Sequence, residues 1–134
     1  MGTPRLVGVP GSGAALKLAL NLSLFGVATA LGEALALATA LGVESGVAAD
    51  VLSSSPWGAL LRSRRGMIAS GAFPAQLRMG LAVKDCHLIR EAAETAGTRV
   101  PVSAAALTWL ESAQRRFGPE VDFAAVIAEI MRQS

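Results

Sequence analysis

The sequence of 134 residues is long enough for one domain with a substantial core, and its formal net charge of +2 is too small to indicate a nucleic-acid partner. Hydrophobic residues make up 52 % of this alanine-rich chain and aromatic residues only 4 %, which favours packed helices over a sheet. The single cysteine, Cys86, excludes an internal disulfide framework and a multi-cysteine metal site, and it agrees with a reducing cytoplasm. We therefore predict an all-α, cytoplasmic protein that binds no metal.

The mean hydropathy of +0.49 raises the question of a membrane span. The longest uncharged run, residues 18–32, has fifteen residues and contains Asn21, Ser23 and Thr29. A helix that crosses a bilayer needs about 20 predominantly apolar residues. We therefore predict no transmembrane segment, and we interpret the excess hydrophobicity as a surface for a protein partner.

Residues 1–10, MGTPRLVGVP, precede the first helical pattern. Leu6–Val9 fits either a final strand or an extended lead-in, and Pro10 opposes a helix before the turn that follows. The chain contains no G-x-G-x-x-G that follows a strand and precedes an acidic residue about 20 positions on. We therefore expect no dinucleotide-binding Rossmann fold within it.

The stretch Gly11–Gly42 predicts one long helix. It contains no proline, it has no charge between Lys17 and Glu33, and it consists largely of Ala and Leu, the strongest helix formers. About seven or eight turns fit between the Gly-Ser-Gly turn at its start and Gly42 at its end. Its hydrophobicity continues almost all the way round, so we expect other helices to enclose it.

Two polar residues stand out on this helix, Lys17 and Asn21. Their i, i+4 spacing places them on the same face, one above the other. Lys17 fits a lysine that extends to water near the helix end, and it fits equally a desolvated lysine that Asn21 positions for proton transfer. Asn21 has the groups for the second role, because its carbonyl accepts hydrogen bonds and its amide donates them.

The rest of the chain predicts shorter helices separated by Gly and Pro. The expected segments are Val43–Ser55, a helix that starts at Pro56 and continues through 57–69, Leu77–Ala96, a helix from about Ser103 to Phe117, and Phe123–Arg132 with Asp122 as its N-cap.

Three side-chain features in these segments have ordinary structural interpretations. The arginines at positions 62, 64 and 65 are typical of a solvated helix face, because no aromatic residues are interleaved with them. His87 fits a surface histidine. Cys86 fits a small buried hydrophobe.

The segment GSGAALKLALNLSLFGVATALGEALALATALGV resembles the hinge and first helix of the β-hydroxyacid dehydrogenase family, which includes 3-hydroxyisobutyrate dehydrogenase and tartronate semialdehyde reductase. Members have a G-x-G turn, then a Lys, then an Asn four residues on, then Ala-Glu-Ala-Leu. The resemblance implies that Lys17 is the catalytic acid/base and that Asn21 holds the substrate or orients the lysine. A second Asn is frequent at the position of Leu20.

A second segment, FPAQLRMGLAVKDCHLIREAAETAG, resembles the Phe…Leu-Lys-Asp-Leu helix of the same family. The resemblance implies that Lys84 reaches the cofactor side of the cleft and that Asp85 supports the local structure, while Leu77 stands where Phe is frequent. One compositional fact agrees with both assignments. The chain has ten arginines and only two lysines, Lys17 and Lys84. Arg hardly gives up its proton, whereas Lys can do so when buried.

Together these segments imply an all-α fold like the C-terminal domain of 6-phosphogluconate dehydrogenase, with one long central helix and about five shorter ones around it. Residues 1–10 would be the hinge from a missing Rossmann domain, and residues 11–134 the helical substrate-binding and dimerisation domain. The backbone of Gly11, Ser12 and Gly13 would approach the substrate carboxylate. NAD or NADP would be held mainly by the missing domain.

The implied reaction is the oxidation of a short hydroxy acid, or the reduction of its semialdehyde, by a homodimer or higher homo-oligomer. The chain alone would be inactive. Two alternatives remain open, a non-catalytic helical oligomerisation module and an imine reductase-like domain. Imine reductases commonly replace the lysine with Asp or Tyr, so Lys17 disfavours the second alternative.

Overall fold

The computed structural model describes residues 11–133. They form six α-helices, α1 Ser12–Ala40, α2 Ser45–Ser53, α3 Ala59–Ser70, α4 Met79–Ala96, α5 Pro101–Phe117 and α6 Ala125–Arg132. Within this part of the chain the one strand-like pairing is an isolated antiparallel bridge between Arg78 and Asp122. The predicted all-α fold is therefore confirmed, and the proposed lead-in at Leu6–Val9 lies outside the described residues.

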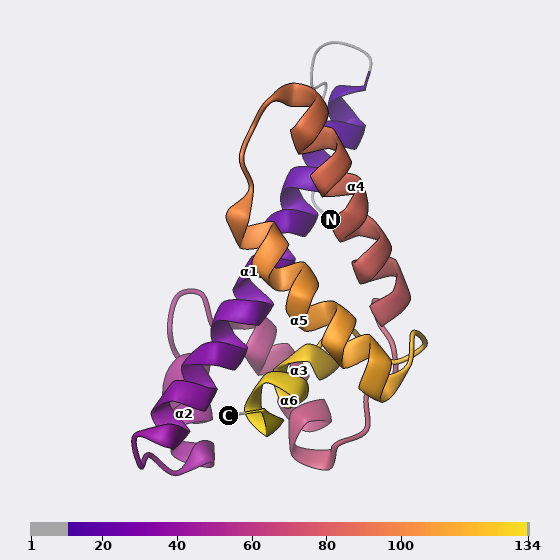
Figure 1. Ribbon diagram of the computed structural model, residues 1–134. Coiled ribbons are helices and arrows are strands. Elements are labelled where there is room, and N and C mark those ends of the chain that lie inside the picture. Colours follow the sequence, from indigo (N-terminus) through magenta and orange to yellow (C-terminus); the bar gives the residue numbers. More distant parts are fainter. Residues whose placement is uncertain (1–10, 134) are drawn as a thin grey trace.

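Helix α1 is the longest element and contacts each of the other five helices, as Figure 1 shows. Its 29 residues extend about 43 Å, whereas the others have 8 to 18 residues. It ends as predicted, because Gly42 takes the left-handed conformation with φ of 96°. The central long helix and its five shorter neighbours agree with the prediction.

The expectation that α1 is enclosed almost all the way round is wrong at both ends. Leu16 and Leu20 are about half exposed, and Leu37 and Leu41 are exposed still more. The buried residues of α1 lie between Phe25 and Ala36. The physical reason is length, because the shorter helices cover only the middle of a helix that outreaches them.

By length and composition alone, α1 is apolar enough to cross a membrane, and 22 % of its most apolar window is buried. The core helix of a soluble bundle meets the same criterion. Phe25, Leu31 and Leu35 of α1 are each at most 2 % exposed within the core. The absence of a transmembrane segment stays a prediction.

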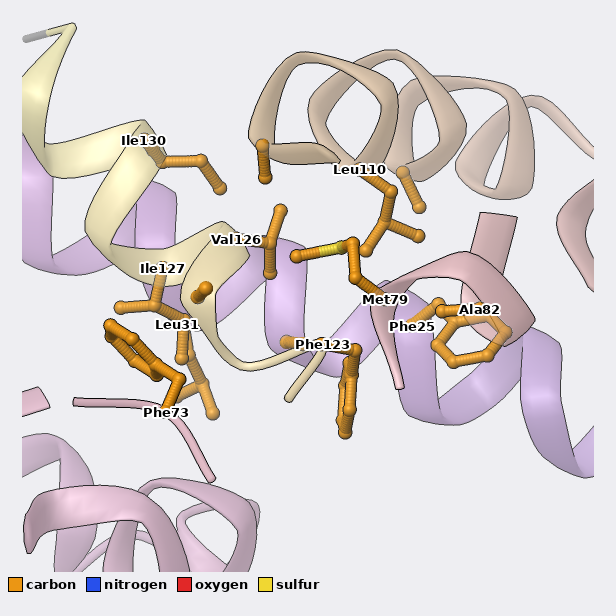
Figure 2. Packing of buried hydrophobic residues seen from close by; sticks show 14 of the residues in the cluster. Phe25, Leu31, Phe73, Met79, Ala82, Leu110, Phe123, Val126, Ile127 and Ile130 are labelled. Atoms are coloured by element: carbon orange, nitrogen blue, oxygen red, sulfur yellow. The ribbon is translucent and has the colours of Figure 1, made fainter. Parts of the chain in front are cut away.

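The core joins the middle of α1 to α6, which share the most extensive helix contact in the described chain. Figure 2 shows Phe25 and Leu31 of α1 among the side chains of α4, α5 and α6. Phe25 packs edge-on against Phe123 with 5.7 Å between ring centroids. Gly32 permits the close approach of α6 to α1, because a Cβ at this position would lie 2.7 Å from Cδ1 of Ile130 on α6.

Two predicted helix starts are shifted by backbone pairing between distant segments. Met79 donates its N–H to the carbonyl of Val121, and Phe123 donates to the carbonyl of Leu77. Residues 77–79 and 121–123 are therefore held against one another instead of entering helices. For this reason α4 begins at Met79 rather than Leu77, and α6 begins at Ala125 rather than Phe123.

Two further shifts follow from Gly and Pro. Helix α3 begins at Ala59, not at Pro56, because Gly58 packs so closely on the end of α2 that a Cβ there would lie 2.3 Å from the carbonyl oxygen of Leu52. Helix α5 begins at Pro101 rather than near Ser103, since proline suits the first helical position.

The N-cap of α6 is Ala124 and not, as predicted, Asp122. Asp122 instead connects several segments. Its side chain is fully buried, and Oδ2 accepts a hydrogen bond from the amide of Ala124 at 3.1 Å. Oδ1 accepts from the amides of Gln76 and Leu77 at 3.0 and 2.9 Å. Arg64 of α3 completes the set through Nε, 3.2 Å from Oδ2. Asp122 thus ties α3, the segment before α4 and the start of α6 together.

The solvated face predicted for the three arginines of α3 is confirmed for the exposed Arg62 and wrong for Arg64, and each of the three also makes a contact within the chain. Arg64 pairs with the buried aspartate just described, and only 12 % of its side chain is exposed. Arg65 contacts Asp50 of α2 at 2.8 Å, and Arg62 donates to the carbonyl of Ser53. The arginines attach α3 to its neighbours and do not form a free basic surface.

Candidate functional site

A groove of 630 Å³ lies between the N-terminal half of α1 and α4. We call it the α1–α4 groove. It brings together the two segments that carry the family resemblance, since Lys17 and Asn21 line it from α1 and Asp85 from α4. The remaining lining residues are Ala14, Leu18, Leu88, Glu91, Ala92, Thr95 and Ala96. Most of the wall is apolar, with one cation, two carboxylates and a carboxamide.

Lys17 lies on the second turn of α1 and is exposed. The side chain of Lys17 makes no hydrogen bond or ion pair with another residue between positions 11 and 133. The described residues therefore do not supply the desolvation that one sequence interpretation expected, and the exposed side chain fits the solvated interpretation. Burial of Lys17 would require protein surface beyond these six helices.

Asn21 is connected to the second motif directly. Its Nδ2 donates a hydrogen bond to Oδ2 of Asp85 at 3.0 Å, across the contact between α1 and α4. The two residues are 64 positions apart, and both are partly buried. The resemblance had implied only that Asp85 supports the local structure. The sequence alone carries no signal for its pairing with Asn21.

Lys84 is exposed on α4 and does not line the groove. Adjacent helical residues point about 100° apart, so Asp85 faces the groove while Lys84 does not. The structure therefore separates the second lysine from the Lys17–Asn21 pair. A cofactor role for Lys84 stays a prediction.

The predicted substrate-binding turn forms the start of α1. Gly11 is its N-cap, with φ of 92° and no side-chain hydrogen bond to the helix, and Ser12 is its first residue. A Cβ at Gly11 or Gly13 would meet nothing within 4 Å, so the turn needs glycine at position 11 for its backbone angle alone. Ala14 lines the groove, but Gly11, Ser12 and Gly13 do not. Their contact with a carboxylate stays a prediction.

Cys86 and His87 lie apart from the groove. Cys86 is buried as predicted, and burial raises the pKa of its thiol to about 11 against the opposing hydrogen bond with Ser103. A thiol in that state is a poor nucleophile. His87 is partly exposed, as expected for a surface residue, and its Nε2 lies 3.6 Å from Glu111 on α5. In the described part of the chain, no three His, Cys, Asp or Glu residues gather as metal ligands.

The arrangement can support acid–base chemistry at one end of an apolar groove. Lys17 can exchange a proton, Asn21 can accept or donate a hydrogen bond, and Asp85 holds Asn21. The described residues do not include a Gly-rich loop between a strand and a helix, which is the usual site of a dinucleotide pyrophosphate.

Comparison with known proteins agrees with this interpretation. The profile of the family described as NAD-binding of NADP-dependent 3-hydroxyisobutyrate dehydrogenase matches residues 11–130. A crystal structure titled 3-hydroxyisobutyrate dehydrogenase from Salmonella typhimurium superimposes with a TM-score of 0.76 at 28 % sequence identity. The similarity covers 90 % of this chain and 42 % of the Salmonella chain.

None of the curated proteins compared by sequence matches the chain. The profile match nevertheless includes α1 to α5 in full and α6 as far as Ile130, and it covers Lys17, Asn21 and Asp85. This chain therefore belongs to the family of NAD-binding domains of NADP-dependent 3-hydroxyisobutyrate dehydrogenases.

Proposed function

We propose that this chain forms the helical, substrate-side part of an NAD(P)-dependent dehydrogenase that oxidises a short hydroxy acid such as 3-hydroxyisobutyrate, or reduces its semialdehyde. The observation that carries the proposal is the convergence of Lys17, Asn21 and Asp85 on one groove. These residues come from two segments far apart in the sequence, and each segment resembles the same family.

In the proposed reaction, Lys17 takes the proton of the substrate hydroxyl during oxidation and returns it during reduction. Lysine suits this task because its amine can shift between protonated and neutral forms when surrounding protein excludes water. NAD or NADP, when bound, would supply the hydride acceptor for oxidation, and its reduced form the hydride donor for reduction, at the carbon that bears this hydroxyl. Asn21 orients Lys17, and the amides at the start of α1 approach the substrate carboxylate.

The described residues would contact only one part of a dinucleotide cofactor. Lys84 is exposed and has no ion-pair partner in residues 11–133, so its ammonium is available to a cofactor phosphate. The main cofactor site would then lie in additional protein, in agreement with a chain that spans about two fifths of the length of its solved relative. We propose that the chain by itself is inactive, and that it works in the cytoplasm as a homodimer or higher homo-oligomer.

A fusion enzyme tests this proposal. It joins residues 11–134 to the part of the Salmonella dehydrogenase that this chain does not cover, and the readout is NADPH formation with 3-hydroxyisobutyrate. We expect activity from the fusion and none from the chain alone. A micromolar Kd for NADPH with the chain alone, measured by titration calorimetry, would contradict the proposal that the main cofactor site lies outside this chain.

The alternative is a helical oligomerisation module without catalysis. The exposed apolar side chains at the ends of α1, Leu16, Leu20, Leu37 and Leu41, favour it because they suit a protein interface. This alternative predicts an assembled but inactive fusion. Activity that depends on Lys17 would rule it out.

A further inference from the structure

The hydrogen bond between Asn21 and Asp85 fixes which way the Asn21 carboxamide points. A carboxylate only accepts hydrogen bonds, so the nitrogen of Asn21 must face Asp85, as it does at 3.0 Å. Rotation by half a turn would bring the Asn21 carbonyl oxygen against the Asp85 carboxylate. Two acceptors would then face one another in a partly buried site, which is unfavourable.

This orientation leaves Oδ1 of Asn21 as its open acceptor. No residue in the described chain donates to Oδ1, and Lys17 lies one turn earlier on the same face of α1. An amine that serves as a base keeps N–H groups that it can donate to Oδ1, and its lone pair remains available for the substrate proton. A reversed carboxamide would instead donate N–H to that lone pair and occupy it.

We propose that Asp85 is a positioning residue that acts on Lys17 through Asn21. By holding Nδ2 on the α4 side, it ensures that Asn21 presents an acceptor and never a donor to the lysine. The inference rests on the proposed function for its catalytic meaning. The orientation itself is a property of the chain and can be tested without any reaction.

Asn21 is the sole asparagine in the sequence, so a chain labelled with ¹⁵N-asparagine gives one side-chain amide signal in NMR. In the parent chain we expect two well-separated proton resonances, with the one bonded to Asp85 shifted downfield. Asp85→Asn keeps the size of residue 85 but allows either orientation of Asn21, so the separation should shrink. Because this variant adds a second asparagine, the double variant Asn21→Ser with Asp85→Asn identifies which signal belongs to residue 85. Glu94→Gln is the matched control, because it removes an exposed carboxylate from the same helix outside the groove.

The second measurement uses the fusion enzyme. Asp85→Asn should lower kcat at least tenfold and leave the KM for 3-hydroxyisobutyrate within about twofold, because the lysine is misdirected while the groove keeps its shape. Glu94→Gln, outside the groove, should change kcat by less than twofold. Circular dichroism of each variant checks that the helices are retained.

The two measurements separate this inference from the proposed function. An Asn21 signal that Asp85→Asn leaves unchanged overturns the inference whatever the activity. A changed signal with unchanged kcat in an active fusion also overturns it, because Asp85 would then orient Asn21 without consequence for Lys17. A changed signal with a parent fusion that is inactive supports the orientation and counts against the proposed reaction.

Discussion

Arg64 Nε lies 3.2 Å from Oδ2 of Asp122, and the carboxylate of this pair is completely buried. Two backbone amides of the segment before α4 and the amide of Ala124 donate to the same side chain. Both oxygens of the carboxylate are therefore hydrogen-bonded, and the charge is neutralised by one arginine. Removing a hydrogen-bonding partner of this buried carboxylate should therefore destabilise the fold more than breaking an exposed ion pair.

Asp122→Ala should lower the free energy of unfolding by about 3–5 kcal/mol, because it leaves amides and the partly buried Arg64 guanidinium without an acceptor. Asp122→Asn should cost less, since it keeps one acceptor oxygen. Urea denaturation followed by circular dichroism measures both. Asp50→Ala is the control, because the Asp50–Arg65 pair is exposed, and it should cost no more than about 1 kcal/mol. A loss of similar size in Asp50→Ala and Asp122→Ala would contradict the central role of Asp122.

Glu129 should make the free energy of unfolding depend on pH in the acidic range. Burial alone would raise the pKa of this carboxyl, but hydrogen bonds from Arg132, Ser112 and Gln133 and the charge of Arg132 outweigh burial and lower it to about 2. The unfolded chain therefore binds the proton more tightly than the folded chain. The stabilisation is complete above about pH 4.5, which is the ordinary pKa of a glutamate, and it is lost as the pH falls toward 2.

This loss amounts to about 3 kcal/mol over the full range. It is measured as the difference in free energy of unfolding between the parent and Glu129→Gln, determined from urea curves between pH 6 and pH 3. The difference should stay constant above about pH 4.5 and shrink as the pH falls below that value. A difference that is the same at both ends of the range would show that Glu129 is not the residue responsible.

Two helical glycines should respond in opposite directions to alanine. Gly32→Ala places a methyl group 2.7 Å from Cδ1 of Ile130 on α6, so we expect a loss of about 1–3 kcal/mol. Gly66 lies in α3, and a methyl group on its Cα would meet nothing within 4 Å, so Gly66→Ala should stabilise the protein by up to about 1 kcal/mol. Thermal unfolding compares the two variants. Equal changes in Tm would mean that the approach of α6 to α1 is not limiting at Gly32.

Lys17→Arg should nearly abolish turnover in the fusion enzyme. The substitution preserves the charge, but guanidinium does not give up its proton near neutral pH, and positioned acid–base catalysis is worth about 10²–10⁴-fold. Asn21→Ala should cost less because the proton donor remains, and Lys84→Arg should mainly raise the KM for the cofactor. Steady-state kinetics give the order. If Lys17→Arg retained turnover within about threefold, the lysine would be only a charge and the proposed mechanism would be wrong.

The chain should self-associate, because both ends of α1 expose leucines that no helix covers. Sedimentation at low micromolar concentration should show a species larger than 13.7 kDa. A variant with four simultaneous Leu→Gln substitutions should shift the distribution toward monomer. The substituted residues are Leu16, Leu20, Leu37 and Leu41. A parent chain that sediments only as a monomer would leave the apolar ends of α1 without this explanation.

The existence of the helices could be predicted from the sequence, but the starts of α2 to α6 could not. Ala-rich and Leu-rich stretches favour helix wherever they occur, which is a local property. The starts of α4 and α6 depend on pairing between Leu77 and Phe123, residues that lie 46 positions apart, and no local pattern reports such a contact. The shared groove position of Lys17 and Asn21 followed from their spacing. The bond from Asn21 to Asp85 did not, because it depends on how α1 and α4 pack.

The same limit explains the arginines of α3. Without the tertiary structure, three basic residues in a short helix look solvated, because their partners are distant in the sequence. Arg64 is matched to Asp122, 58 positions later, and Arg65 to Asp50 on the preceding helix. The sequence shows which residues are charged, but only the fold shows which of them are neutralised.

The pairing of α1 with α6 also has a consequence for synthesis. The first and last described helices form the most extensive contact, and α6 contributes Val126, Ile127 and Ile130 to the core. Among the described helices, α1 leaves the ribosome before its main partner, because α6 begins 85 positions after α1 ends. Until α6 has been made, the side chains of α1 that pack on it remain uncovered even where α2 to α5 are in place, and exposed apolar surface of this kind makes a folding intermediate prone to aggregation.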